Sequence, residues 1–195
     1  MELIFSKLKF SKHLALLFIF GLLVSCGESI SNQVASSESF SGIENELKNK
    51  FGNEAYYTDL TITYNKSIGN IVGVTVTDNP ESLKMGQWNS TQNNWKQTSE
   101  ITLEVPSGSK ASDFMFQLDD NINLSTLGTL VETSSKQLAD EKDIEKPILH
   151  LASVKFPRNG DDSKTEYLVM LQPEHGGTIF TFSYHLNGEL IKMDY

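Results

Sequence analysis

The sequence is poor in the residues that most often carry covalent and metal chemistry. Its 195 residues include one cysteine, Cys26, one arginine, Arg158, and four histidines. One cysteine forms no disulfide within the chain and no multi-cysteine metal site. One arginine leaves little capacity for the bidentate clamps that hold phosphate and carboxylate groups. We therefore expect a fold held by apolar burial, and the chain is long enough for one ordinary core.

Long hydrophobic runs are also scarce, and the one that is present lies near the start of the chain. It spans residues 14–24, follows the lysines Lys7, Lys9 and Lys12, and is followed by Ser25. A basic segment, an apolar run and a small residue form the usual order of a secretory signal peptide. A bilayer core of about 30 Å needs about 20 apolar residues, so this run is too short for a transmembrane helix. The sequence predicts a signal peptide over residues 1–25.

The four residues Leu23-Val24-Ser25-Cys26 resemble the lipobox of bacterial lipoproteins. The resemblance implies that signal peptidase II cleaves between Ser25 and Cys26 and that Cys26 carries a diacylglyceryl group and further acyl chains such as palmitate. Two or more acyl chains anchor a protein stably in a membrane. The alternative is a soluble secreted protein whose one cysteine happens to lie beside the cleavage site.

The residue after the lipobox cysteine influences sorting in lipoproteins, where Asp favours retention at the inner membrane. Here that residue is Gly27, and only Glu28 is acidic among the positions just after it. The resemblance therefore implies delivery to the outer membrane of a two-membrane cell, facing the periplasm, with surface display as the alternative.

The charge of the mature chain limits its partners. Removal of residues 1–25 takes away three lysines and one glutamate, which leaves 13 basic and 24 acidic side chains and a formal charge of −11. An acidic surface repels nucleic-acid phosphates and anionic head groups. We expect no nucleic-acid binding, and we expect the lipid on Cys26, rather than surface charge, to hold the protein at the membrane.

Residues 26–41 are mostly polar and predict a flexible spacer. Residues 42–195 then predict a single α+β domain. Its first helix runs from an N-cap at Ser41 to Phe51, with apolar residues at four-residue spacing and Gly52 as the stop. A second helix is predicted over residues 124–143, with Ser125 as its cap.

Alternating apolar residues predict antiparallel strands after each helix. After the first helix they form a hairpin of residues 60–64 and 72–76, then a segment around Trp88 and Trp95, strand residues 101–105, and a short strand through Phe114, Phe116 and Leu118. After the second helix the predicted strands are 148–156, 166–172, 178–184 and 189–193, and Asn187-Gly188 is a strong hairpin turn.

The fold class that follows is α+β, with antiparallel sheet packed against two helices. The order of helix then strands occurs twice, so the chain has two candidate halves, 42–118 and 119–195. This order is similar to small periplasmic modules such as cystatin-like folds and the tandem domains of β-lactamase inhibitor proteins. The resemblance rests on element order and carries no functional residues.

No catalytic or metal motif stands out. Asp119, Asn121 and Asn123 alternate like a calcium loop, but Leu124 and Leu130 occupy the positions that need Gly and Glu. The three histidines after the signal, at positions 150, 175 and 185, lack zinc-motif spacing. Asp161-Asp162 lies in a polar turn, where we expect ordinary carboxyl pKa values rather than the shifted pair that glycosidases use. We predict no cofactor, no metal and no catalytic residue.

Aromatic residues remain as candidates for binding. Trp88, Trp95, Tyr56 and Tyr57 are of the type enriched at protein interfaces. Packing within the sheet is the alternative, because aromatic residues also stabilise neighbouring strands. The sequence leaves both interpretations open.

Three functional hypotheses follow. The first is a non-enzymatic, lipid-anchored envelope protein that binds a protein partner or has a structural role. The second is a binder of a small or lipophilic ligand, in a pocket between sheet and helix lined by Phe114, Phe116, Phe180 and Phe182. The third is a hydrolase whose active-site residues are dispersed along the sequence.

Overall fold

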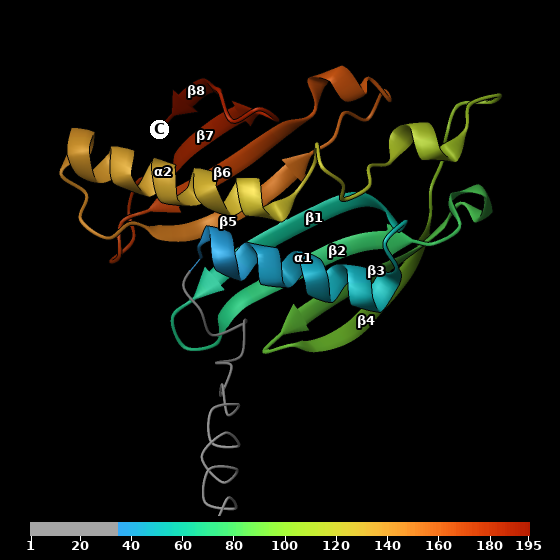
Figure 1. The fold of residues 1–195 in the computed structure, drawn as a ribbon, viewed down its shortest axis with the longest axis horizontal. Coiled ribbons are helices and arrows are strands. Elements are labelled where there is room, and N and C mark those ends of the chain that lie inside the picture. The colour runs from blue at the N-terminus through green and yellow to red at the C-terminus, as the bar shows by residue number, and fades with distance from the viewer. Residues whose placement is uncertain (1–34) are drawn as a thin grey trace, which may run out of the picture.

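Two helices cover one face of an eight-stranded antiparallel sheet in a computed structural model, which describes residues 35–195 (Figure 1). The α+β prediction is confirmed. The predicted signal peptide, Cys26 and most of the predicted spacer lie outside the described residues. The helices are α1 (Ser37–Phe51) and α2 (Leu124–Lys142), and the strands are β1 (Tyr56–Asn65), β2 (Gly69–Thr77), β3 (Lys84–Thr91), β4 (Asn94–Thr102), β5 (Ile148–Lys155), β6 (Glu166–Gln172), β7 (Phe180–His185) and β8 (Leu190–Asp194).

The sheet is built from two similar meanders that meet at its centre. The strand order is β4-β3-β2-β1-β5-β6-β7-β8, so each helix is followed by four strands that run outward from the middle. Strands β1 and β5 join the halves through Thr61 opposite Ser153 and Ile62 opposite Ala152. The predicted junction at residues 118 and 119 falls in the connection between β4 and α2.

The core lies between the helices and the sheet. Along the inner strands β1–β3 and β5–β7, alternation turns every second side chain toward the helices, and most of those side chains are buried. Leu60 and Ile62 of β1, Val169 of β6 and Phe182 of β7 are fully covered. The helices add Leu47 from α1 and a set of apolar residues from α2, namely Leu124, Leu127, Val131 and Leu138.

Helix α1 begins earlier than the sequence predicted. Ser36 is its N-cap and forms a capping box with Ser39, so the helix starts at Ser37 instead of after Ser41. Phe40, which the prediction placed in the spacer, is fully buried. The predicted spacer of residues 26–41 is therefore too long at its C-terminal end, because burial of Phe40 and the Ser36 cap both favour the extra helical turn.

The segment between β4 and α2 differs from its prediction as a strand. Residues Ala111–Phe114 form a 3₁₀ helix, and Phe116 makes one isolated bridge to Tyr57. The bridge forms near the start of β1, outside the stretch in which β1 pairs with β5. Thr61 and Ile62 on the same edge of β1 pair with β5, a contact between distant parts of the chain that the sequence does not show. At the start of α2, Asn123 is the N-cap in place of Ser125.

Candidate functional site: the open face of the sheet

We call the face of the sheet turned away from α1 and α2 the open face, and it is the main candidate surface. The strand register places one row of its side chains across all eight strands, in the order Lys96, Asn89, Gly73, Thr61, Ser153, Leu168, Ser183 and Lys192. No described helix covers this row. The residues at its middle, Gly73, Thr61 and Ser153, are small.

The centre of the open face is apolar. Leu168 lies in the row, and Ile71, Leu151 and Met170 lie one register step to the side, where Leu151 is opposite Met170. All four side chains are half-buried. Hydroxyl groups surround them, including those of Thr61, Thr63, Thr181 and Ser183. An apolar centre inside a polar surround is the usual composition of a protein interface.

Charged groups occupy the margin of the open face. Lys155 of β5 lies opposite Glu166 of β6, and their side chains form an ion pair at 3.2 Å. On the edge strand β8, Lys192 Nζ lies 2.6 Å from Asp194 Oδ2. The hydrogen bond and charge of Asp194 raise the pKa of Lys192. Charged groups at the margin of an interface influence the orientation in which a partner binds more than they increase its affinity.

Both edges of the sheet are open to strand addition. Eight of the nine residues of β4 are exposed, and β8 exposes Leu190 and Ile191 at 43% and 38% of their surface. An edge strand presents unpaired N–H and C=O groups that an extended segment of another chain can join. The edges therefore extend the candidate surface beyond the open face.

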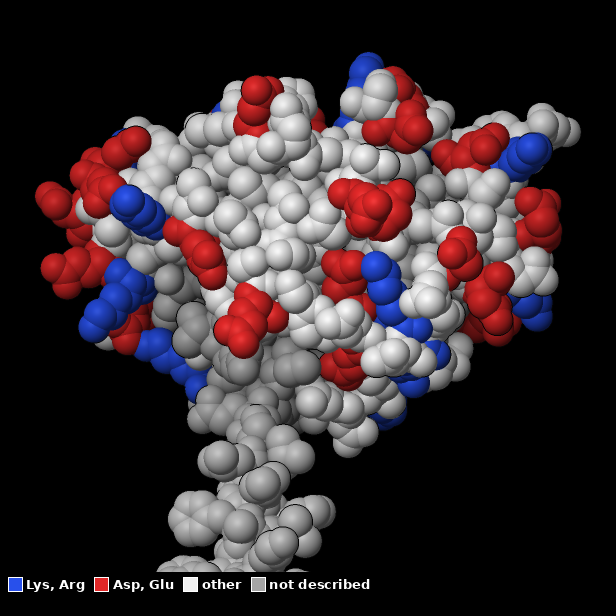
Figure 2. Space-filling model, in the orientation of Figure 1, with Lys and Arg blue, Asp and Glu red and all other residues white. Residues whose placement is uncertain are grey.

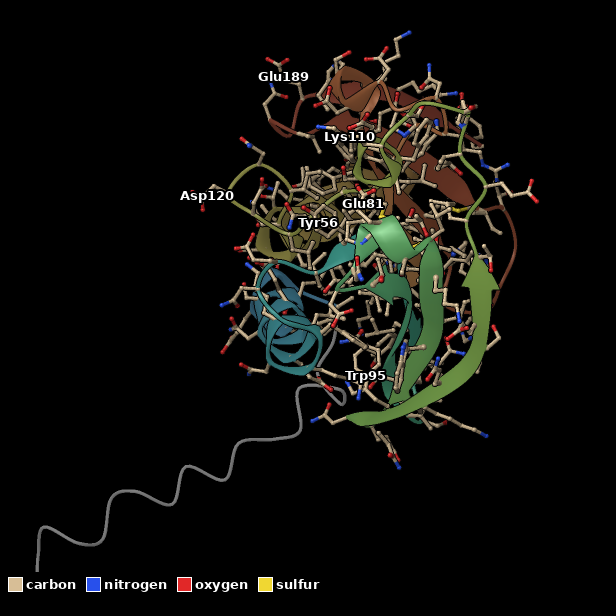
Figure 3. The ribbon with its side chains drawn as sticks, turned by 90° about the vertical axis from the view of Figure 1, so that its right-hand side faces the viewer. Tyr56, Glu81, Trp95, Lys110, Asp120 and Glu189 are labelled. Carbon is tan, nitrogen blue, oxygen red and sulfur yellow. The ribbon has the colours of Figure 1, made fainter. Side chains whose placement is uncertain are left out.

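The segment from Leu103 to Leu118 limits the open face at one end (Figure 3). There Met85 of β3 is buried under Ala111 and Met115 of this segment. Tyr56 packs against the same small cluster, and Thr58 Oγ1 contacts Met85 Sδ at 3.6 Å. None of the four apolar residues at the centre of the open face belongs to this cluster.

The four candidate aromatic residues are separated by the fold. Trp88 and Trp95 lie on the helix side, where both rings meet the Phe51 ring edge-on at centroid distances of 5.5 and 5.4 Å. Trp95 Nε1 also donates to Glu46. Tyr57 is in the core with 1% of its surface exposed, and Tyr56 is half-buried. None of the four contributes to the centre of the open face.

That centre was missed by sequence reasoning. Leu168 and Met170 lie in a strand that the sequence predicted correctly, where they alternate with buried residues. The signal for this apolar centre in the sequence is the presence of apolar residues on both sides of the strand, since a strand with one solvent-exposed face usually has polar residues on that face.

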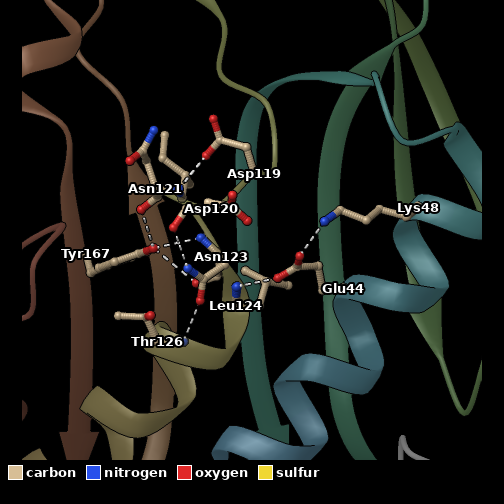
Figure 4. Close-up of polar contacts among 10 residues, drawn as sticks. Glu44, Lys48, Asp119, Asp120, Asn121, Asn123, Leu124, Thr126 and Tyr167 are labelled. Atoms are coloured by element: carbon tan, nitrogen blue, oxygen red, sulfur yellow. Dashed lines mark hydrogen bonds and ion pairs between the residues drawn. The ribbon is translucent and has the colours of Figure 1, made fainter.

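The side chains of the acidic turn before α2 hold the turn and cap α2 (Figure 4). Asp119 Oδ1 accepts hydrogen bonds from the N–H groups of Asn121 and Ile122, both at 2.8 Å. Asn123 Oδ1 accepts from Thr126 N at 2.8 Å. The side-chain oxygens of Asp119 and Asn123, which resemble part of a calcium loop in the sequence, therefore accept hydrogen bonds from backbone N–H groups.

The turn borders a hollow of about 610 Å³ that Asp120 and Asp162 also line. Among residues 35–195, no group of three or more His, Cys, Asp or Glu side chains is placed to hold a metal ion. The exposed histidines at positions 150, 175 and 185 lie on β5, in the turn before β7 and at the end of β7. A hydrogen bond from Ser163 lowers the pKa of Asp161, which is opposite to the raised pKa of a catalytic acid.

The helix side has a different surface. Acidic side chains are scattered over it between uncharged areas (Figure 2). No helix within residues 35–195 has both the length and the apolar character needed to cross a membrane.

Comparisons with known proteins give a fold relationship. No protein-family model matches the chain, and no curated protein matches it. Among solved structures, the chain is similar to one described as a putative lipoprotein from Clostridium difficile 630, with a TM-score of 0.50 and 13% sequence identity. The similarity covers 85% of this chain and 96% of the other. At this identity it shows a shared fold.

Proposed function

We propose that this protein is a lipid-anchored protein of the bacterial cell envelope that binds a protein partner through the open face of its sheet. The observation that carries the proposal is the uncovered apolar centre of Leu168, Met170, Leu151 and Ile71 within a polar surround. Such a surface is suited to burial against another protein and needs no catalytic group.

The anchor is supported by the lipobox-like sequence that ends at Cys26. The structural neighbour described as a putative lipoprotein adds weak support, since the two share their fold. Ala35, where the described structure begins, lies nine positions after Cys26, so the chain between them spans at most about 30 Å. The domain would therefore stay near the membrane surface, and Gly27 favours the periplasmic side of an outer membrane.

Mass spectrometry of the N-terminal peptide tests the anchor. The mature protein isolated from membranes should begin at Cys26 and carry a diacylglyceryl group. Cys26→Ser should keep its signal peptide, because the lipobox cysteine is the modified residue. A wild-type protein that begins elsewhere and carries no lipid would overturn the anchor.

Site-specific photo-crosslinking in the native envelope tests the binding surface. A photoreactive residue at Leu168 should capture a discrete partner, while the same residue at Thr133, exposed on α2, should not. Leu168→Glu should abolish capture from a second open-face position, Met170, and Thr133→Glu should leave it unchanged. Equal capture from Leu168 and Thr133, or capture that survives Leu168→Glu, would contradict the open-face proposal.

A further inference from the structure

A cavity of about 540 Å³ opens between α2 and the ends of β1 and β5. Its walls are mainly apolar and come from several separate segments, with Ala35, Tyr64, Val131, Pro147, Ile148 and Leu149 among the lining residues. Val131 and Leu149 belong to the buried core, so the cavity reaches down to the packed interior. Cavities of this size and lining are typical of small-molecule sites.

The rim of the cavity carries two lysines and one carboxylate. Lys66 forms an ion pair with Glu174, and Lys146 also lines the cavity. The hydrogen bond and charge of Lys66, with a smaller contribution from Lys146, lower the pKa of Glu174. This excess of positive charge is unusual for a chain with a formal charge of −9.

The rim can rearrange to accept an anion. Lys66 and Glu174 expose 55% and 37% of their side chains, and exposed ion pairs contribute little to stability. An incoming anionic group could therefore take Lys66 from Glu174 at low cost. Lys146 supplies a second positive charge and does not take part in the Lys66–Glu174 ion pair.

The position of the cavity connects it to the membrane. Ala35, the first described residue, is part of its wall, and Cys26 lies nine residues earlier. If Cys26 is anchored as proposed above, the mouth of the cavity lies within about 30 Å of the anchored residue. Lipids of the same membrane, and the acyl chains proposed on Cys26, are then within reach of this mouth.

We propose that this cavity binds the acyl chain of a single-chain membrane lipid with an anionic head group, and that Lys66 and Lys146 bind the head group. The apolar wall and the basic rim match the two ends of such a molecule. The inference depends on the proposed anchor only for the location of the cavity near the membrane, and it does not depend on the open face.

A photoactivatable long-chain fatty acid provides the test, added to envelope vesicles that contain the full mature protein. We expect its label in the peptides that carry Val131 and Leu149. Val131→Trp should fill the cavity and reduce labelling at least tenfold, while Thr133→Trp, two residues away and exposed, should not. Labelling that Val131→Trp leaves unchanged would overturn the cavity as the site.

A second variant separates loss of the site from loss of the fold. Ser135→Trp changes a half-buried residue that lines the cavity and should also reduce labelling. Both tryptophan variants should retain the cooperative thermal transition of the wild type. If labelling persists in Ser135→Trp whenever that variant is folded, the inference fails.

Two further arms test the head group and the source of the lipid. The matching uncharged fatty alcohol should label less than the acid, and Lys66→Gln with Lys146→Gln should remove that difference. Equal labelling by acid and alcohol in the wild type would overturn the role of the lysines. If labelling of the wild type appears only after removal of the acyl groups from Cys26, the protein's own lipid occupies the cavity and a free lipid is excluded.

The outcomes also remain distinct from those of the proposed function. Loss of the cavity label with normal capture from Leu168 affects this inference alone. An unmodified N-terminus at Cys26 with normal labelling removes the anchor and leaves the cavity assignment in place.

Discussion

Glu44 of helix α1 caps helix α2: its Oε2 accepts a hydrogen bond from the backbone N–H of Leu124 at 2.7 Å. Its other carboxylate oxygen pairs with Lys48 at 2.6 Å (Figure 4). Glu44 and Leu124 are 80 positions apart in the chain. One carboxylate therefore joins the helices of the two halves and satisfies an N–H group that an isolated helix would leave unpaired.

Replacement of Glu44 should weaken the whole domain. Glu44→Ala should lower the free energy of unfolding by about 1 kcal/mol, the usual cost of a lost N-terminal cap. Urea denaturation gives the measurement, with Glu38→Ala, an exposed carboxylate at the start of the same helix, as the control. Equal effects of the two changes would show that Glu44 acts only as a surface charge.

Tyr57 and Tyr184 should respond oppositely to the loss of their hydroxyl groups. The Tyr57 hydroxyl is buried and has no hydrogen-bond partner within residues 35–195, whereas Tyr184 Oη shares a hydrogen bond of 2.7 Å with Ser134 Oγ. Tyr57→Phe should be neutral or stabilising by up to about 1 kcal/mol, and Tyr184→Phe should cost about 1 kcal/mol. Denaturant unfolding of both variants checks the contrast, and a destabilised Tyr57→Phe would indicate an unseen partner.

Alkaline pH should destabilise the fold through its buried phenols. Burial is the main reason that the pKa of Tyr167 rises from 10.0 to about 12. The unfolded chain then loses this proton at a lower pH than the folded chain does. The stability that the neutral phenol contributes is complete below pH 10 and is lost as the pH rises to about 12.

The measurement is the unfolding free energy at several alkaline pH values, together with the phenolate absorbance. In the wild type, the absorbance should show that some of the tyrosine side chains ionise only when the protein unfolds. Tyr167→Phe should reduce the steepness of the stability loss. A stability that does not change between pH 10 and 12 would contradict the direction of this shift.

Gly128 should be intolerant of a methyl group. A Cβ atom there would lie 2.6 Å from the carbonyl oxygen of Ser36 and 2.7 Å from Cα of Ser37, at the start of α1. Gly128→Ala should therefore cost about 1–3 kcal/mol of stability through overpacking, although alanine favours helix by about 1 kcal/mol. Thr129→Ala, at the exposed next position, is the control for thermal unfolding. A stabilised Gly128→Ala would mean that the helices can separate freely.

Phe51 should control the environment of both tryptophans in the chain. Its ring contacts Trp88 and Trp95 edge-on, and each such pair contributes about 0.5–1.5 kcal/mol. Phe51→Leu should shift tryptophan emission to the red and lower stability by about 1–3 kcal/mol. Phe156→Leu, which changes a ring that contacts Phe116, should lower stability without this spectral change.

Several elements could be predicted from the sequence because they depend on neighbours in the chain. The β6 prediction of residues 166–172 matches the structure, and the hairpins that follow it were placed correctly within a few residues. Period-two alternation and turn residues act over a few positions, so they can be read directly. The start of α1 was wrong because Phe40 and the Ser36 cap depend on where the helix packs.

The candidate binding surfaces depend on contacts between distant parts of the chain. The predicted pocket residues Phe116, Phe180 and Phe182 are buried in the core, whereas the apolar cavity uses Tyr64, Val131 and Leu149. Likewise, Trp88 and Trp95 pack against α1. An apolar side chain can lie in the core or at the surface, and the strand order determines which of the two it does.

The sequence by itself predicts lipid attachment at Cys26, and it determined the acidic charge and the repeated order of helix then strands, because each of these features is local or additive along the chain. The tertiary structure decided that β1 pairs with β5, which joins two meanders into one sheet. That pairing creates the row from Thr61 to Ser153 and Leu168 on the open face. A row of this kind is set by register between strands that are distant in sequence, and local propensity carries no information about it.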